Sequence, residues 1–194
     1  MAGHFEATPG GGAAVALDEV EIAILRSLAV QLLELIGPGD EPAEGEDPLA
    51  ALFAEGPSEP PTDPALARLF PEAYGDGDDE LRAASAEFRR FTENDLRTRK
   101  REDALVVVRT LDALTPAGDG AAVLTLTADE CRNWLGSLND LRLTIGTRLD
   151  VSDEDEGEEG SLYRLPDSDP RKPMVMAYLW LGALQETLVE TMMP

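Results

Sequence analysis

The sequence predicts a mainly α-helical protein: a single-domain bundle over residues 1–194, with about four principal helices and one or two short β-strands. Two observations predict this class. Four long segments repeat apolar residues at intervals of three and four, which is the period of an amphipathic helix and not of a strand. The chain has 194 residues, of which 43% are hydrophobic, and this suffices for one sizeable core.

The first 36 residues predict a short hairpin followed by a helix. FEAT and AVAL flank PGGG, and two short apolar stretches around a glycine-rich turn are typical of a hairpin. Helical periodicity then runs from Leu17 to Ile36, and Gly37-Pro38 ends it. The expected apolar stripe consists of Leu17, Ile24, Leu28, Leu32 and Leu35.

Residues 37–77 are expected to form an acidic, proline-rich surface loop that carries short helices. Eight of the fourteen prolines fall between Pro38 and Pro71. DPLAALFAE and DPALARLF each begin with Asp-Pro, which is typical of an N-cap followed by proline at the first helical position. Each stretch therefore predicts a helix of one or two turns.

Residues 78–114 have a helical pattern whose apolar face changes position along the segment. The first stripe consists of Leu81, Ala84, Phe88 and Phe91. The second lies about half a turn round the helix and consists of Ala104, Val107, Val108, Leu111 and Leu114. The pattern predicts either a bent helix or two helices that meet near residues 92–103.

Residues 121–150 predict a short strand and then a long helix. AAVLTLT, at 121–127, is the strand candidate. Thr127 and Glu130 match the S/T-x-x-E capping box that precedes a helix. The two glycines inside this helix, Gly136 and Gly146, each cost about 1 kcal/mol relative to alanine, which indicates close packing of a neighbouring helix. The apolar side consists of Trp134, Leu138, Leu141, Ile145 and Leu149.

The C-terminal part predicts an acidic loop over residues 151–161 and a final helix over about 170–192. SDEDEGEEG carries six acids in nine residues, which is typical of a solvated loop. Trp180 and Gly182 lie near the middle of the final helix. We expect the four principal helices to pack around Trp134 and Trp180, and the apolar surplus of the last two helices favours a homodimer.

The charge of the chain argues against direct DNA binding. Sixteen Lys and Arg residues face 39 Asp and Glu residues, for a net charge of −23. Such a chain repels a phosphate backbone, whereas sequence-independent DNA binding depends on cations that neutralise phosphates. The longest apolar stretch, residues 174–184, is too short to span a bilayer. Without a signal peptide and with one cysteine, the chain is expected to be cytoplasmic.

RTRKRED, at residues 97–103, is unusual because it places four cations in five residues of an acidic chain. These cations could hold a nucleic acid, dock on an acidic partner or on the acidic loop, or form the solvated face of a helix. A protein partner is favoured over nucleic acid, because no aromatic residues interleave with the cations. The candidate contacts are Arg90, Arg97, Arg99, Lys100 and Arg101.

Two further candidates lie in the helix after Thr127. Cys131 is the only redox candidate; amide donors of the first turn lower a thiol pKa, whereas neighbouring acids raise it. A buried structural cysteine is the alternative. Asn139, Asp140 and Arg142, in WLGSLNDLRLTIGTRL, are either structural bracing or a partner site.

No catalytic or cofactor machinery is evident in the sequence. His4 is the one histidine, and with His4 alone neither a Ser-His-Asp set nor a Cys-His set can be assembled. SDEDEG lacks the oxygen spacing of a calcium loop, and PGGGAA is not followed by a phosphate-binding motif. We therefore expect no enzyme activity, no metal and no cofactor.

Four stretches together resemble one known family. They are E-x-x-x-L (21–25), LR-x-RK (96–100), WL-x-x-LNDLRL-x-IG-x-RL (134–149) and Y-x-WLG-x-LQE-x-LV (178–189). They resemble the actinobacterial AosR family of oxidative-stress transcriptional regulators, formerly a domain of unknown function. The resemblance covers nearly the whole chain except residues 37–77 and 150–162.

This resemblance implies a cytosolic, mainly helical protein that acts on transcription with an alternative sigma factor. We therefore expect a non-enzymatic regulator that binds a sigma factor or RNA polymerase, and DNA only indirectly or weakly. Genes for a ClpS-type protease adaptor and a sulfur-carrier route to cysteine tend to lie beside those of the family. The alternative is thus a helical adaptor linked to Clp proteolysis or cysteine synthesis. A disulfide switch within one chain needs two thiols, and Cys131 is the only cysteine.

Overall fold

The computed structural model describes residues 3–38, 56–74, 77–114, 121–151 and 165–193. These residues form helices α1 (Glu19–Ile36), α3 (Pro64–Leu69), α4 (Asp79–Asp112), α5 (Ala128–Arg148) and α6 (Lys172–Met192), and strands β1 (Glu6–Thr8), β2 (Gly12–Asp18) and β3 (Ala121–Leu126). The mainly helical class with four principal helices is confirmed. The described strands number three rather than one or two. DPLAALFAE and SDEDEGEEG lie outside the described residues.

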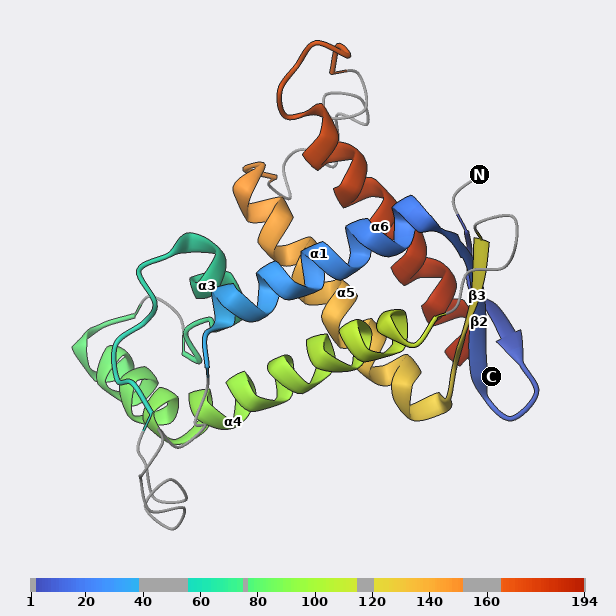
Figure 1. Cartoon of the computed structure of the whole chain (residues 1–194). Coiled ribbons are helices and arrows are strands. Elements are labelled where there is room, and N and C mark those ends of the chain that lie inside the picture. Colours follow the sequence, from blue (N-terminus) through green and yellow to red (C-terminus); the bar gives the residue numbers. More distant parts are fainter. Residues whose placement is uncertain (1–2, 39–55, 75–76, 115–120, 152–164, 194) are drawn as a thin grey trace.

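The three strands form one antiparallel sheet in the order β1-β2-β3. β1 and β2 are the expected hairpin, and Gly10 and Gly11 take positive φ angles of 103° and 83° at its turn, a conformation that glycine adopts readily. β3 pairs with the other edge of β2. The sheet lies at one end of the helices, and α6 contacts β1 and β2 there (Figure 1).

Local capping signals explain where three of the helices begin. The predicted capping box of Thr127 and Glu130 is present at the start of α5. Asp63 caps α3 ahead of a proline in its first turn, as its Asp-Pro sequence predicts. Asp18 and Glu21 form a second capping box at the start of α1. In each case a side chain accepts hydrogen bonds from amides that have no partner within the helix.

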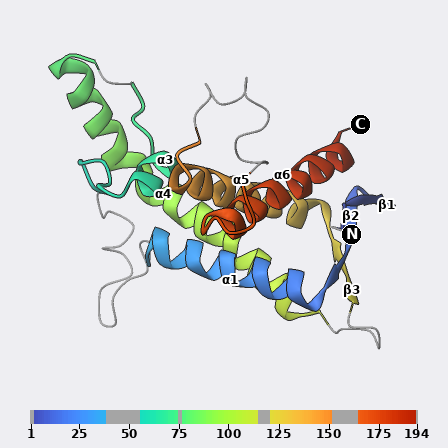
Figure 2. The ribbon, with the colours of Figure 1, turned by 90° about the horizontal axis from the view of Figure 1, so that it is seen from above.

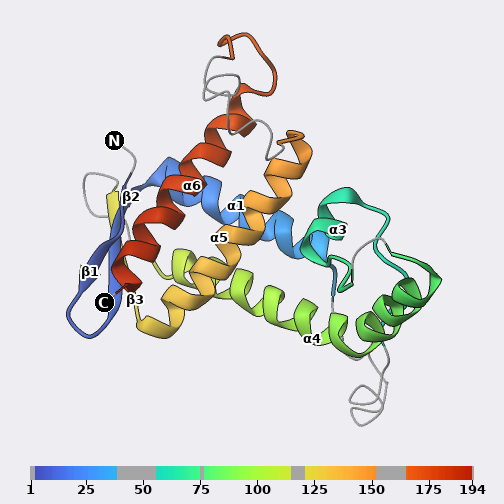
Figure 3. The same cartoon turned by 180° about the vertical axis from the view of Figure 1, so that it is seen from behind.

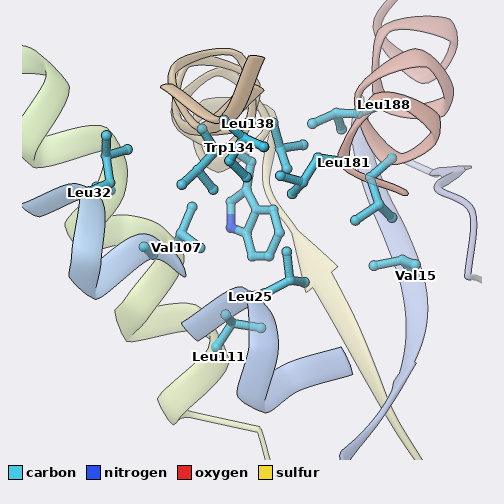
Figure 4. Packing of buried hydrophobic residues seen from close by; sticks show 14 of the residues in the cluster. Val15, Leu25, Leu32, Val107, Leu111, Trp134, Leu138, Leu181 and Leu188 are labelled. Atoms are coloured by element: carbon cyan, nitrogen blue, oxygen red, sulfur yellow. The ribbon is translucent and has the colours of Figure 1, made fainter. Parts of the chain in front are cut away.

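Trp134 lies at the centre of the core and is fully buried. Side chains from α1, α4, α6 and β2 surround its ring (Figure 4), and its indole Nε1 donates to Thr110 Oγ1 over 3.0 Å. The predicted apolar side of α5 is confirmed, because all its members are buried. Trp180 is only half-buried and packs at the edge of the core. The expectation that it shares the centre with Trp134 is wrong.

The predicted stripe before Gly37 is confirmed in part: Leu32 is buried and Leu28 and Leu35 pack against the core, while Leu17 is buried but belongs to β2 and not to the helix. Ile24 is exposed, whereas the buried residues of the helix are Leu25, Ala29, Leu32 and Ile36. The helix is apolar around much of its surface, so periodicity alone did not fix which side faces the core.

α4 is one continuous helix of 34 residues, and its N-terminal part runs in a different direction from the rest (Figure 1). The bent-helix alternative is therefore the observed one. The second predicted stripe is right, because Ala104, Val107 and Leu111 are buried. The first is wrong: Phe88 and Phe91 are 48% and 60% exposed. The buried residues of that part are polar, namely Ser85, Arg89 and Glu93.

α5 is the central helix and contacts α4, α6, α3 and α1. It crosses the molecule between α4 and α6, with α3 near the end remote from the sheet (Figures 2 and 3). Gly136 of α5 faces Asp103 of α4, and Gly146 faces Tyr178 of α6. The predicted close packing at both glycines is confirmed. No helix among the described residues is long and apolar enough to cross a membrane.

Candidate functional site

Two cations of the RTRKRED stretch donate hydrogen bonds to the carbonyl oxygens at the C-terminus of α1. Arg97 Nη1 donates to the carbonyl oxygen of Ile36 over 2.5 Å, and Arg101 Nη1 donates to the carbonyl oxygens of Gly37 and Leu33. The last turn of α1 has no basic residue of its own. Because the final carbonyls of a helix lack partners and carry partial negative charge, these two arginines stabilise α1 from outside.

Lys100 is used within the chain as well. Its Nζ lies 2.6 Å from Asp140 Oδ1 of α5, and the side chain of Asp140 is 2% exposed. Burial raises the pKa of Asp140, while the hydrogen bond and charge of Lys100 lower it. The structure thus places Asp140 in the seam between α4 and α5, whereas its neighbour Asn139 is exposed.

A second buried polar group fixes the segment before α4. Arg89 Nη1 donates to Glu93, and its Nη2 donates to the Phe70 carbonyl and to Glu72. Arg97 donates to the other oxygen of Glu93, so these two residues form an i,i+4 ion pair. The Arg97 guanidinium also lies 4.4 Å from the centre of the Phe70 ring. The buried role of Arg89 was not predicted from the sequence.

The remaining candidate cations are Arg90 and Arg99. Arg99 is exposed. Arg90 is half-buried, and its guanidinium lies 4.8 Å from the centre of the Phe91 ring. The structure therefore does not bring the five predicted cations together on one surface. Arg97, Lys100 and Arg101 point into contacts with α1 and α5, and Arg90 lies beside an exposed aromatic residue.

That aromatic residue belongs to an exposed apolar area, which we call the α4 aromatic surface. Tyr74 packs edge-on against Phe88, with ring centres 6.1 Å apart. A small pocket of about 190 Å³ beside Phe88 is lined mainly by apolar atoms. Because Arg89 and Glu93 occupy the buried side of this part of α4, the apolar side chains lie outside. The members of the surface are Tyr74, Leu81, Phe88, Phe91 and Leu96.

A second exposed feature is a groove between α5 and α6, of about 800 Å³. Arg142 forms one wall: it donates to Gln185 Oε1 over 2.6 Å, and its guanidinium lies 5.4 Å from the centre of the Tyr178 ring. The Arg142 side chain lies beside Gly182, at a distance where a Cβ would make ordinary van der Waals contact with it. The remaining lining residues are Leu179, Ala183, Glu186, Val189 and Glu190. Only Arg142 was predicted, although Tyr178, Gln185 and Glu186 lie within the last quoted motif.

Cys131 is 1% exposed, and burial raises the pKa of its thiol. The thiolate is the reactive form of cysteine, so this environment disfavours reaction. Within the described residues, no three His, Cys, Asp or Glu side chains are grouped so that they could hold a metal ion.

The described residues form a mainly helical bundle that exposes apolar side chains on α4 and on α6. The chain belongs to the family described as domain of unknown function DUF2017, whose model matches residues 2–192. Proteins of Mycobacterium bovis and Mycobacterium tuberculosis named oxidative stress regulator AosR are 29% identical to it over 184 residues, covering 89% of this chain and 78% of theirs.

A Mycobacterium leprae relative is 30% identical over 187 residues, covering 89% of this chain and 79% of its own. No solved structure was found to match the chain. The resemblance inferred from the four sequence motifs is therefore confirmed: the chain is a homologue of an oxidative stress regulator, and the curated relatives are named as regulators and not as enzymes.

Proposed function

We propose that this chain is a non-enzymatic, transcription-associated regulator linked to oxidative stress, which binds a sigma factor or RNA polymerase through the α4 aromatic surface. The observation that carries the proposal is the exposure of Phe88 and Phe91 on the N-terminal part of α4, whose buried side is polar, with Tyr74 of the preceding segment packed against Phe88. Exposed apolar patches mark interaction sites. Aromatic and arginine side chains are enriched among the residues that dominate interface energies, and Arg90 lies against Phe91.

Charge supports a protein partner over DNA. The net charge is −23, and three of the five candidate cations are already bound to carbonyls or carboxylates of the chain itself. These three cations are thus not available to neutralise phosphates, which is what non-specific DNA affinity depends on. An acidic regulator reaches a promoter more readily through a protein that binds the DNA.

The proposal is tested with the full chain immobilised and purified RNA polymerase, with and without its sigma factors, from the same organism. Capture that is lost when Phe88 and Phe91 are replaced by Ser supports it. Absence of capture, together with recovery of Clp protease or cysteine-synthesis components from a cell extract, would replace it with the adaptor function.

A further inference from the structure

All methionines that follow Met1 lie on one helix or its C-cap. The chain has five methionines. The four on α6 and its C-cap are exposed: Met174 to 43%, Met176 to 54%, Met192 to 36% and Met193 to 67%. Methionine is ordinarily a buried residue. Where it is exposed in groups, its flexible, polarisable side chain suits a binding surface that adapts to its partner.

These methionines border the α5–α6 groove. Positions three or four apart share one side of a helix. Met174 precedes Tyr178 by four residues and Met176 precedes Leu179 by three, while Met192 and Met193 follow Val189 by three and four. Tyr178, Leu179 and Val189 all line the groove. Helical spacing therefore puts exposed thioethers next to residues of the groove toward both ends of α6, although no methionine is among the lining residues.

The groove has acidic groups on its α6 side. Glu186 and Glu190 are both exposed and lie one turn apart. Arg142 is the one cation among the lining residues, and Gln185 and Tyr178 hold it against the wall. A groove that combines apolar side chains with two glutamates, on a chain of net charge −23, complements a helix that is apolar on one face and basic on the other.

We propose that the α5–α6 groove docks a basic amphipathic helix of a partner protein, and that peroxide weakens this docking by oxidising the four methionines. In this step the thioether sulfur attacks a peroxide oxygen, the O–O bond breaks, a sulfur–oxygen bond forms and water leaves. The sulfur loses two electrons and the peroxide gains them. The sulfoxide makes an apolar thioether polar, and methionine sulfoxide reductases reverse the oxidation.

This site differs from Cys131 in every property that matters for reaction with an oxidant. The Cys131 side chain is buried and burial raises its pKa, whereas thiol oxidation needs an accessible thiolate. The methionines are exposed and require no deprotonation. The proposal goes beyond the proposed function, because it concerns a different face from the α4 aromatic surface and is tested without RNA polymerase.

The docking is tested with a labelled synthetic peptide of Leu and Lys, about 18 residues or five helical turns long, whose pattern makes an amphipathic helix. A peptide of the same composition in scrambled order is the control. We expect the patterned peptide to bind the full chain about tenfold more tightly, which corresponds to about 1.4 kcal/mol, and the variant E186K/E190K to remove this preference. Equal binding of both peptides would show plain charge attraction and overturn the docking site.

The oxidation is tested on the same complex. After peroxide treatment, peptide mass spectrometry is expected to find sulfoxide at the four methionines and an unmodified Cys131, and the affinity for the patterned peptide to fall about tenfold. Methionine sulfoxide reductase should restore it. A variant with all four methionines replaced by Leu, a volume-conserving change, should bind the peptide and keep its affinity in peroxide. An equal loss of affinity in that variant, or oxidation of Cys131 before the methionines, would overturn the oxidant site.

Discussion

The ammonium of Lys100 on α4 lies 2.6 Å from the carboxylate of Asp140 on α5, in a seam where Asp140 is almost fully buried. Lys100 is the centre of the most basic stretch of the chain, and Arg97 and Arg101 on either side of it bind the C-terminus of α1. Much of this stretch therefore holds α1, α4 and α5 together. We therefore expect a substitution in this stretch to lower the stability of the fold before it affects the binding of any partner.

Replacing Lys100 with Met should destabilise the chain by about 3–5 kcal/mol, because the substitution leaves a buried carboxylate without its cation. Urea unfolding at neutral pH measures the loss. The loss should shrink in acid, where Asp140 becomes protonated. The double variant K100M/D140L should recover most of the stability, since an apolar pair of similar volume replaces a buried ion pair at little cost. A double variant as unstable as K100M would show that the pair is not isolated.

Replacing Asp103 with Asn should stabilise the chain at neutral pH and have little effect in acid. Asp103 accepts a hydrogen bond from Asn133 over 2.8 Å, which an amide oxygen can also accept. Burial raises the pKa of Asp103, with the Asn133 hydrogen bond opposing. The folded chain thus binds this proton more tightly than the unfolded chain. Its contribution is fully present below the ordinary Asp pKa of about 3.9 and is lost as pH rises through the raised value.

The measurement is the free energy of unfolding of both proteins from acid to neutral pH. The difference should grow in favour of D103N as the pH rises. If the difference in unfolding free energy instead moved against D103N as the pH rises, the pKa of Asp103 would not be raised in the folded chain.

Replacing each of three arginines of the same stretch by Ala should lower the free energy of unfolding by clearly different amounts. Arg97→Ala should cost about 3 kcal/mol, because it also leaves the buried Glu93 with one cation fewer. Arg101→Ala should cost about 1.5 kcal/mol for lost charge-assisted hydrogen bonds to α1. Arg99→Ala, at an exposed position, should stay within about 0.5 kcal/mol. Thermal and urea unfolding give the order, and equal effects at all three would refute the capping role.

The Cys131 thiol should react with a disulfide reagent much more slowly in the folded chain than in the same chain in concentrated urea. The side chain is buried and burial raises its pKa, so the reactive thiolate forms mainly when the structure opens. Absorbance of the released thiol reports the rate. Comparable rates in both conditions would mean that Cys131 is reachable, and thiol chemistry between two chains would then be open to it.

Elements with strong local signals were predictable from the sequence. Thr127 with Glu130 marks the start of α5, and Asp63-Pro64 marks α3, because capping depends on residues within one turn. What could not be predicted depends on contacts between distant residues. Arg89 is buried because Phe70 and Glu72 come to it from another segment, and this in turn leaves Phe88 exposed.

The same reason limits prediction of the candidate sites. The sequence marked the basic stretch as a surface, since nothing local shows that the C-terminus of α1 lies beside it. The sequence marked Arg142 as a candidate but did not predict the groove, because the groove also needs Tyr178 and Gln185 of α6. The signal that could have indicated the α4 aromatic surface was a polar residue, Arg89, on the buried side of α4.

Replacing Phe88 and Phe91 together with Ser should abolish capture of RNA polymerase or a sigma factor while leaving the fold intact. Both side chains are about half exposed or more, so their removal creates no cavity in the core, whereas truncating aromatic anchors of an interface often costs 2 kcal/mol or more of binding. Val123→Ser is the matched control, because Val123 is also an exposed apolar residue but belongs to β3 and not to α4. Capture is measured by biolayer interferometry, and circular dichroism reports the fold. Capture that survives the double substitution, or that Val123→Ser reduces equally, would move the docking site away from α4.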